Sequence, residues 1–239
     1  MIRLHDYLLN ELAECSELNF RDRSVYLWIL IAAPRSVNNL SRKLGLTWTT
    51  TAKACRRLAA AEWLLLQKES NIICPIPLIP IRCQAKLAEM LEHDYGLAPH
   101  KGEFLMKRQL DLRIRSLRFF ENARPKFLTN PMSNQQLEYD RYYLDGFAFE
   151  FNGTPHYTSA PGMATQEEIR TRDLLKVGLS KENGIELVVV TSKDLRPDKF
   201  VKLLPEGLQR NHVDEEGPYA KTLGRIGTHY ADKALRGSR

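Results

Sequence analysis

Length, composition and charge already exclude several classes of protein. The chain has 239 residues, enough for one large domain or two small ones, each with its own hydrophobic core. Its formal net charge is +6, which favours a polyanionic partner such as nucleic acid. The four cysteines have no metal-ligand spacing, so we expect free thiols rather than a zinc site. The longest apolar run, residues 25–33, is too short to span a bilayer, and no signal peptide precedes it. We therefore expect a cytoplasmic protein without a membrane partner.

The first third of the chain predicts three helices followed by a β-hairpin. Residues 22–33 have a helical pattern that ends before a proline. Ser36 can cap the second helix, Gly45 supplies its stop, and a third helix begins at Thr47. Residues 64–76 then form two short apolar runs around a polar turn, which is typical of a hairpin.

The third of these helices carries side chains suited to DNA. Three helices followed by a hairpin resemble a winged helix-turn-helix domain, which we place at residues 1–84. The resemblance implies that the third helix enters the major groove, where hydroxyls and cations meet base edges and phosphates. The candidate contacts on this helix are Thr47, Trp48, Thr49, Thr50, Lys53, Arg56 and Arg57. The same fold also serves as a protein-docking module, and this alternative stays open.

A second basic segment follows an expected linker helix at residues 85–100. Residues 101–126 contain eight Lys or Arg residues. A solvated helix face accounts for half of them, and a surface along a nucleic-acid backbone accounts for more, so Lys107 and Arg108 are predicted to contact DNA. Glu103 stands at the start of this helix, where the macrodipole favours an acid.

A hairpin near the middle of the chain carries two acids among aromatic residues. Alternating phenylalanines occupy one face of its second strand and leave Glu150 on the other. A two-residue loop would put Asp140 on the opposite face from Glu150. A three-residue loop with Gly146 in a left-handed conformation pairs Tyr143 with Phe147 and sets the two acids side by side. Adjacent like charges are destabilising unless a cation bridges them, so this register favours a metal site. Two solvated acids on an exposed face are the alternative.

A helix and a buried strand come next. Thr165 and Glu168 form a capping-box pattern, Gly184 stops the helix, and residues 185–190 are predicted to form a buried strand. With the acids on the hairpin, this order of elements resembles the core of the restriction-endonuclease-like nucleases, the PD-(D/E)XK superfamily. The nearest likeness is to its very short patch repair endonuclease branch, and the resemblance covers about residues 101–195.

The resemblance implies a metal-dependent active site. Asp140 becomes the central metal ligand and Glu150 the second carboxylate, holding Mg²⁺ or, as a substitute, Mn²⁺. Asn152 occupies the place where the pattern usually has Lys. Two residues could compensate, a histidine that follows the strand and a lysine on the next helix. Glu103 matches the acid that helps to hold the metal or its water. The candidate catalytic residues are therefore Asp140, Glu150, Asn152, His156, Lys176 and Glu103.

Together these features predict an α+β two-domain fold. A winged helix-turn-helix precedes an α/β restriction-endonuclease-like core, a mixed central sheet flanked by helices, at residues 101–204, and residues 205–239 form a C-terminal helical extension. The predicted function is a metal-dependent DNA endonuclease directed to DNA by the winged helix. The alternative is a non-enzymatic DNA-binding regulator or assembly factor that keeps an inactive nuclease fold as a platform. A protein partner from a mobile-element, defence or repair system would suit either function.

Overall fold

The computed structural model describes residues 4–153 and 166–237, and the chain divides into two compact units. Unit 1 comprises Met1–Leu117 and Pro205–Ile226, and unit 2 comprises Arg118–Leu204 and Gly227–Arg239. Both units mix helices with a sheet, as the sequence predicts. Across the described ranges, no helix combines the length and the apolar character needed to cross a membrane.

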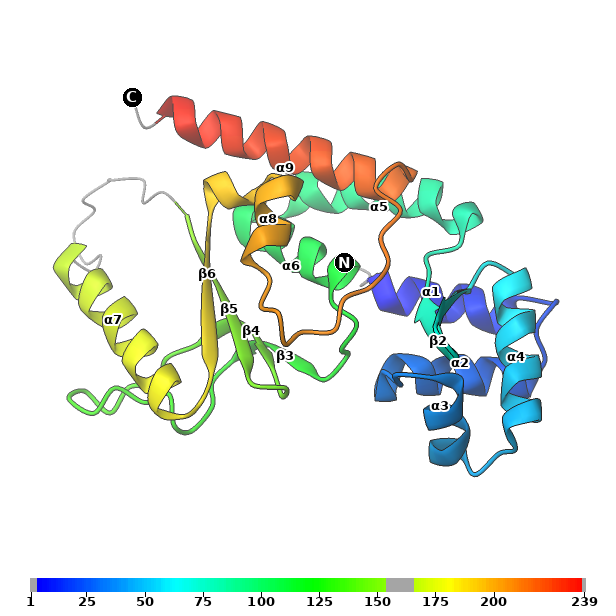
Figure 1. The fold of residues 1–239 in the computed structure, drawn as a ribbon. Helices are drawn as coiled ribbons and strands as arrows, with labels where there is room; N and C mark the ends of the chain where they lie inside the picture. Colours follow the sequence, from blue (N-terminus) through cyan, green and yellow to red (C-terminus); the bar gives the residue numbers. More distant parts are fainter. Residues whose placement is uncertain (1–3, 154–165, 238–239) are drawn as a thin grey trace. The chain divides into compact units, whose positions relative to one another are not determined.

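Unit 1 begins with four helices and a two-stranded hairpin (Figure 1). These elements are α1 (Leu4–Glu14), α2 (Phe20–Ala32), α3 (Val37–Leu44), α4 (Trp48–Ala60), β1 (Leu64–Glu69) and β2 (Ile72–Pro77). Two longer helices follow, α5 (Ile81–Leu97) and α6 (Lys101–Arg113). The core between the helices and the hairpin includes Tyr26 and Trp63, whose rings meet edge to face at 5.3 Å between centroids.

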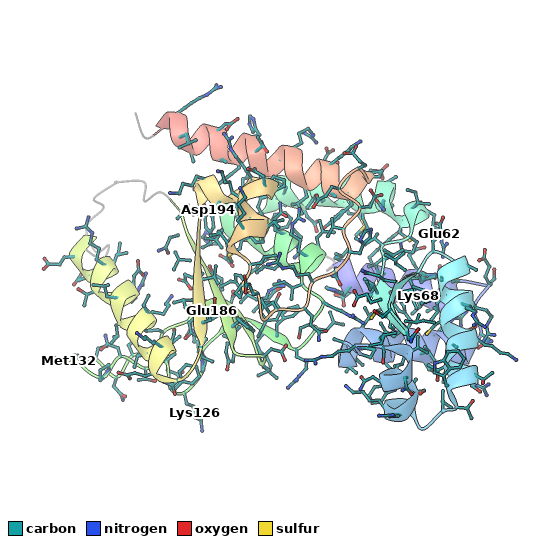
Figure 2. The ribbon with its side chains drawn as sticks, viewed as in Figure 1. Glu62, Lys68, Lys126, Met132, Glu186 and Asp194 are labelled. Atoms are coloured by element: carbon teal, nitrogen blue, oxygen red, sulfur yellow. The ribbon has the colours of Figure 1, made fainter. Side chains whose placement is uncertain are left out.

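Local capping signals set the helix ends in this unit. The side chain of Ser36 accepts a hydrogen bond from the backbone N–H of Asn39, and Gly45 ends α3 in the left-handed region at φ +64°. Thr47 caps α4 in the same way, so the predicted starts of α3 and α4 are confirmed. The hairpin turn is shorter than the four-residue polar turn, Lys68 to Asn71, that the sequence predicts. Glu69 pairs with Ile72, and Lys68, labelled in Figure 2, belongs to β1 rather than to the turn.

Unit 1 extends beyond the boundary expected at residue 84. The C-terminal end of α6 is joined to the segment after residue 205, where Ile114 forms a β-bridge with Arg210. Arg113 is buried and pairs with Glu215, with 2.5 Å between Nη1 and Oε1. These contacts connect residues about one hundred positions apart and explain why the end of α6 and the segment after residue 205 belong to one unit.

Unit 2 contains a four-stranded mixed sheet with the strand order β3-β4-β5-β6. The strands are β3 (Phe119–Ala123), β4 (Tyr139–Tyr143), β5 (Phe147–Asn152) and β6 (Glu186–Thr191), and Glu186 is labelled in Figure 2. The first three strands are antiparallel, and β6 runs parallel to β5. Helix α7 (Gln166–Glu182) connects β5 to β6, so the order is strand, strand, strand, helix, strand.

Helices cover both faces of this sheet. Leu175 and Leu179 of α7 pack against a core that contains Tyr139 and Ala148. Beyond β6 the chain forms the short helix η1 (Ser192–Leu195) and then α8 (Pro197–Leu203), which lies on the other side of β6 from α7 (Figure 1). The last helix, α9 (Pro218–Gly237), contributes to both units. Its part in unit 2 meets β5 through the rings of Tyr230 and Phe151, at 6.4 Å between centroids.

The register predicted for the β4–β5 hairpin is confirmed. Tyr143 pairs with Phe147 across the loop, and Gly146 has φ +94°. That backbone conformation is accessible to glycine and strained for residues with a Cβ atom. The three-residue loop therefore sets which side chains of the two strands share a face.

Two glycines of unit 2 should respond in opposite directions to the same substitution. A methyl group at Gly146 would meet no atom closer than 3.8 Å, so Gly146→Ala should cost about 1 kcal/mol of unfolding free energy from backbone strain alone. Gly178 lies inside α7 with open space around it, so Gly178→Ala should stabilise by about 0.5–1 kcal/mol. Urea denaturation of the whole chain measures both. Equal stability of Gly146→Ala and wild type would contradict the strained loop.

Candidate active site

Asp140 and Glu150 lie on the same face of the sheet, at the point where β4 and β5 separate. The paired ladder between these strands ends at Arg141 and Phe149, one position before the two acids. Beyond that pair the side chain of Asp140 spans the gap, and its Oδ2 accepts a hydrogen bond of 2.7 Å from the backbone N–H of Phe151. A carboxylate takes the place of a ladder partner there, which fixes its orientation.

Lys176 reaches the same place from α7. Its Nζ lies 2.5 Å from Oε1 of Glu150, and the two side chains are only 6% and 17% exposed. A chain of hydrogen bonds holds this turn of the helix. The Oγ of Ser180 donates to the carbonyl oxygen of Lys176 at 2.6 Å, so the hydroxyl of Tyr139 is the donor in its 2.5 Å contact with Ser180. Tyr139 precedes Asp140, and the turn that bears Lys176 is thereby tied to β4 beside the acids.

The surroundings of Glu150 favour a proton near neutral pH. Burial, and next the charge of Asp140, raise its pKa to about 7 against the lowering effect of Lys176. The ion pair occupies Oε1, whereas Oε2 is buried and has no hydrogen-bond partner in the parts of the chain that the structure describes. A buried carboxylate oxygen without a hydrogen-bond partner is an unsatisfied acceptor, and it can bind a proton or a cation.

The donor set fits a magnesium ion held by two carboxylates and water. Oε2 of Glu150 and the carboxylate of Asp140 are hard oxygen ligands, and Mg²⁺ commonly binds one or two carboxylates while keeping several waters. Within residues 4–153 and 166–237, no group of three or more His, Cys, Asp or Glu side chains forms a larger cluster. Lys176 already neutralises part of the charge of Glu150, so it competes with a cation at this carboxylate.

Of the remaining predicted catalytic residues, the structure places only some beside Asp140 and Glu150. Asn152 ends β5 and lines a pocket of about 330 Å³ together with Glu150 and Lys176. His156, like the expected helix cap Thr165, lies outside the described residues. Glu103 belongs to unit 1, where it pairs with Lys107 at 2.5 Å. The structure thus brings Asp140, Glu150, Asn152 and Lys176 together.

Most of the predicted contacts of α4 lie on its accessible face. Thr49, Lys53 and Arg56 are exposed and follow helical spacing along one side, and Trp48 is half exposed. The hydroxyls of Thr47 and Thr50 bond to each other at the start of the helix. Arg57 has a structural role that the sequence did not indicate. It makes two hydrogen bonds to the fully buried carboxylate of Asp22, at 2.8 and 2.5 Å.

The expectation that Lys107 and Arg108 contact DNA is not supported by their surroundings. Both are buried, with 7% of each residue exposed. Lys107 pairs with Glu103, and Arg108 pairs with Asp111 at 3.0 Å while its guanidinium lies over the ring of Phe104. Because burial and internal acids satisfy these cations, we leave them out of the proposed DNA surface.

Sequence reasoning also missed the residues that support the site. Ser180 lies one helical turn after Lys176, so the i, i+4 spacing was an available signal. The contact from Tyr139 to Ser180 spans 41 positions and had no local signal.

Comparisons with known proteins leave the family open. No family model matches the chain, and no solved structure matches it significantly. The chain is similar to an uncharacterized protein, 033L, of Invertebrate iridescent virus 3, with 34% identity over 112 residues. That match covers 43% of this chain, which spans 57% of the length of the viral protein.

The raised pKa of Glu150 predicts a pH-dependent stability. The folded protein keeps a proton on this carboxyl up to a pKa of about 7, whereas the unfolded chain releases it near the ordinary value of 4.5. The stabilisation is therefore complete below about pH 4.5 and disappears as the pH rises through 7, a change of roughly 3 kcal/mol.

Glu150→Gln should remove this fall in stability, and the exposed Glu186→Gln should retain it. Urea denaturation of both variants and of wild type, in a series of buffers that covers this pH range, measures the difference. A wild-type protein whose pH dependence matches that of Glu150→Gln would show that Glu150 titrates normally.

Proposed function

We propose that the protein is a metal-dependent DNA endonuclease, with a restriction-endonuclease-like PD-(D/E)XK domain in unit 2. The observation that carries the proposal is the meeting of Asp140, Glu150 and Lys176 on one face of the sheet, where β4 and β5 separate. The mixed sheet with a helix between its parallel strands agrees with the resemblance seen in the sequence. Two acids and a cation at one point suit phosphodiester hydrolysis.

Each of the three residues has a defined part in this chemistry. Mg²⁺ or Mn²⁺, when bound by Asp140 and Glu150, would supply Lewis-acid stabilisation of the phosphate and lower the pKa of a bound water. The N–H of Phe151 keeps the carboxylate of Asp140 oriented before substrate arrives. Lys176 favours the ionised form of Glu150 and places a positive charge where a phosphate gains negative charge. In our proposal Lys176 thus fills the role that the pattern normally gives to the residue at Asn152.

Unit 1 supplies a second support for DNA as the substrate. We propose that α2, α3, α4 and the β1–β2 hairpin form a winged helix-turn-helix that binds duplex DNA. The exposed side of α4 offers Thr49, Lys53 and Arg56, which combine a hydroxyl with two cations. Such a domain would bring the carboxylate site to a DNA strand.

One observation favours a second candidate, a DNA-binding platform without enzymatic activity. The ammonium of Lys176 neutralises Glu150 without any metal, and Asn152 stands at the position that normally carries the catalytic Lys. A site closed by its own ion pair would keep the fold and lose the reaction. Cleavage assays separate the two candidates.

Removing either acid should abolish cleavage and leave DNA binding intact. Asp140→Ala and Glu150→Ala each remove charge stabilisation and water activation, so we expect a rate loss of roughly 10²–10³ or more. Glu138→Ala, at a partly exposed acid just before β4, is the matched control and should cleave normally. Of Lys176→Met, Asn152→Ala and His156→Ala, the first should lose most activity. If the wild type binds DNA but cleaves no linear, supercoiled or branched substrate with Mg²⁺ or Mn²⁺, the platform function replaces the nuclease.

The DNA surface of α4 should be visible in the salt dependence of binding. Lys53→Ala and Arg56→Ala each remove one cation that would neutralise a phosphate, so each should reduce the slope of log K against log salt by roughly 0.9. Lys86→Ala removes an exposed cation from α5 and should leave the slope unchanged. Fluorescence anisotropy of a labelled duplex over a range of salt concentrations gives these slopes. Unchanged slopes in both α4 variants would show that this helix does not contact the DNA backbone.

A further inference from the structure

The pocket beside the carboxylates has a lining that phosphodiester hydrolysis does not explain. It lies in unit 2 between α7 and the β5–β6 face of the sheet, and its volume is about 330 Å³. Its walls are mainly aliphatic, formed by Leu174 and Val177 of α7 and by Leu187 and Val189 of β6. Leu174 is 74% exposed, Val177 47% and Val189 37%, although each lies in a regular element next to a core. Exposed apolar side chains that gather in a hollow indicate a binding site.

Polar groups are placed at the same pocket. Asn152 offers an amide that both donates and accepts hydrogen bonds. Arg170 and Asp173 add a planar set of donors and a pair of acceptors from α7. Within the portions of the chain that the structure describes, none of these three side chains has a hydrogen-bond or ion-pair partner. Aliphatic walls with a few unused donors and acceptors match a flat heteroaromatic ring with polar edges.

The location of the pocket beside the carboxylate site indicates which ligand would supply such a ring. Glu150 and Lys176 belong both to the pocket and to the carboxylate site, so a phosphate bound at that site carries its own nucleoside into reach of the pocket. A base within an intact duplex has both faces stacked and its pairing edge engaged, so it cannot enter. An unpaired base can leave the stack at little cost and bury a face against apolar side chains.

We infer that this pocket receives one unpaired nucleobase of the DNA strand bound at the carboxylate site, an inference that rests on the proposed function. Leu174, Val177, Leu187 and Val189 contact the faces of the base, and Asn152, Arg170 and Asp173 contact its edges. The site consequently prefers DNA with a bulged, mismatched or single-stranded nucleotide to a fully paired duplex.

Binding of two matched DNA duplexes tests the inference. One duplex carries a single unpaired 2-aminopurine, and the other is fully paired with the same flanking sequence, so contacts made by α4 cancel in the comparison. The full-length wild type, in EDTA to prevent cleavage, should bind the bulged duplex about tenfold more tightly. The fluorescence of 2-aminopurine should rise on binding because the base leaves its stacked neighbours.

Variants of α7 locate the effect. Val177→Trp fills the pocket and should abolish both the preference and the fluorescence rise, whereas Thr171→Trp adds the same ring at an exposed position outside the pocket and should retain them. Leu174→Glu, at a largely exposed position, places a charge on the wall and should also abolish the preference, which keeps the test available if Val177→Trp fails to fold.

Equal affinity of the wild type for the two duplexes, or an undiminished preference in folded Val177→Trp or Leu174→Glu, would overturn the inference. Cleavage measured separately in Mg²⁺ distinguishes the two proposals. A base preference in EDTA without cleavage in Mg²⁺ retains the pocket and rejects the nuclease, whereas cleavage without a preference rejects the pocket alone.

Discussion

The ion pair between Glu150 and Lys176 is the interaction on which the proposed active site of unit 2 depends. A carboxyl that is mostly buried beside a second acid would be neutral at physiological pH without a cation close to it. Lys176 supplies that cation from α7 and is itself buried, so each charge makes the burial of the other tolerable. The same contact joins the helix to the sheet. The position of α7 and the ionisation of Glu150 are therefore coupled.

The proposed site also depends on the hairpin register, which brings the two acids to one face of the sheet. A shift of one residue between β4 and β5 would send Asp140 to the opposite side of the sheet from Glu150. The left-handed conformation of Gly146 prevents this shift by closing the loop with three residues. At the other end of the hairpin the strands separate, and the bond from Phe151 N–H to Asp140 replaces the ladder. A defined register followed by a defined separation therefore fixes where the carboxylate of Asp140 lies relative to β5.

Unit 1 shows how poorly a count of charges describes a surface. Many basic residues of this unit are used internally, by Asp22, by acids of α6, and by Glu215. Arg115 is buried and donates to the carbonyl oxygens of Pro34 and Pro75, which links the connection between α2 and α3, and strand β2, to the segment after α6. The exposed cations of α4, Lys53 and Arg56, are grouped on one side of the helix. The distribution of charge, rather than its sum, supports a DNA surface.

The sequence by itself determined the features that depend on neighbouring residues. Ser36, Thr47 and Gly45 set helix ends because a cap acts within one turn, and Gly146 set the hairpin register because a loop constrains only its two strands. The β4–β5 hairpin, the helix that follows it and strand β6 were predicted from patterns of the same short range. The sequence also placed Asp140 and Glu150 side by side, since alternation along a strand assigns each side chain to a face.

Only the tertiary structure decided which cations act on which acids. Sequence reasoning offered both His156 and Lys176 for the role left open at Asn152, and the fold brings Lys176 to Glu150 across 26 positions. It buried Lys107 and Arg108, which local charge had assigned to DNA, and it formed the pocket from helix α7 and the two strands β5 and β6 that precede and follow it in sequence. The physical reason is that burial and long-range ion pairs depend on the packing of distant segments, which no local pattern of residue types encodes.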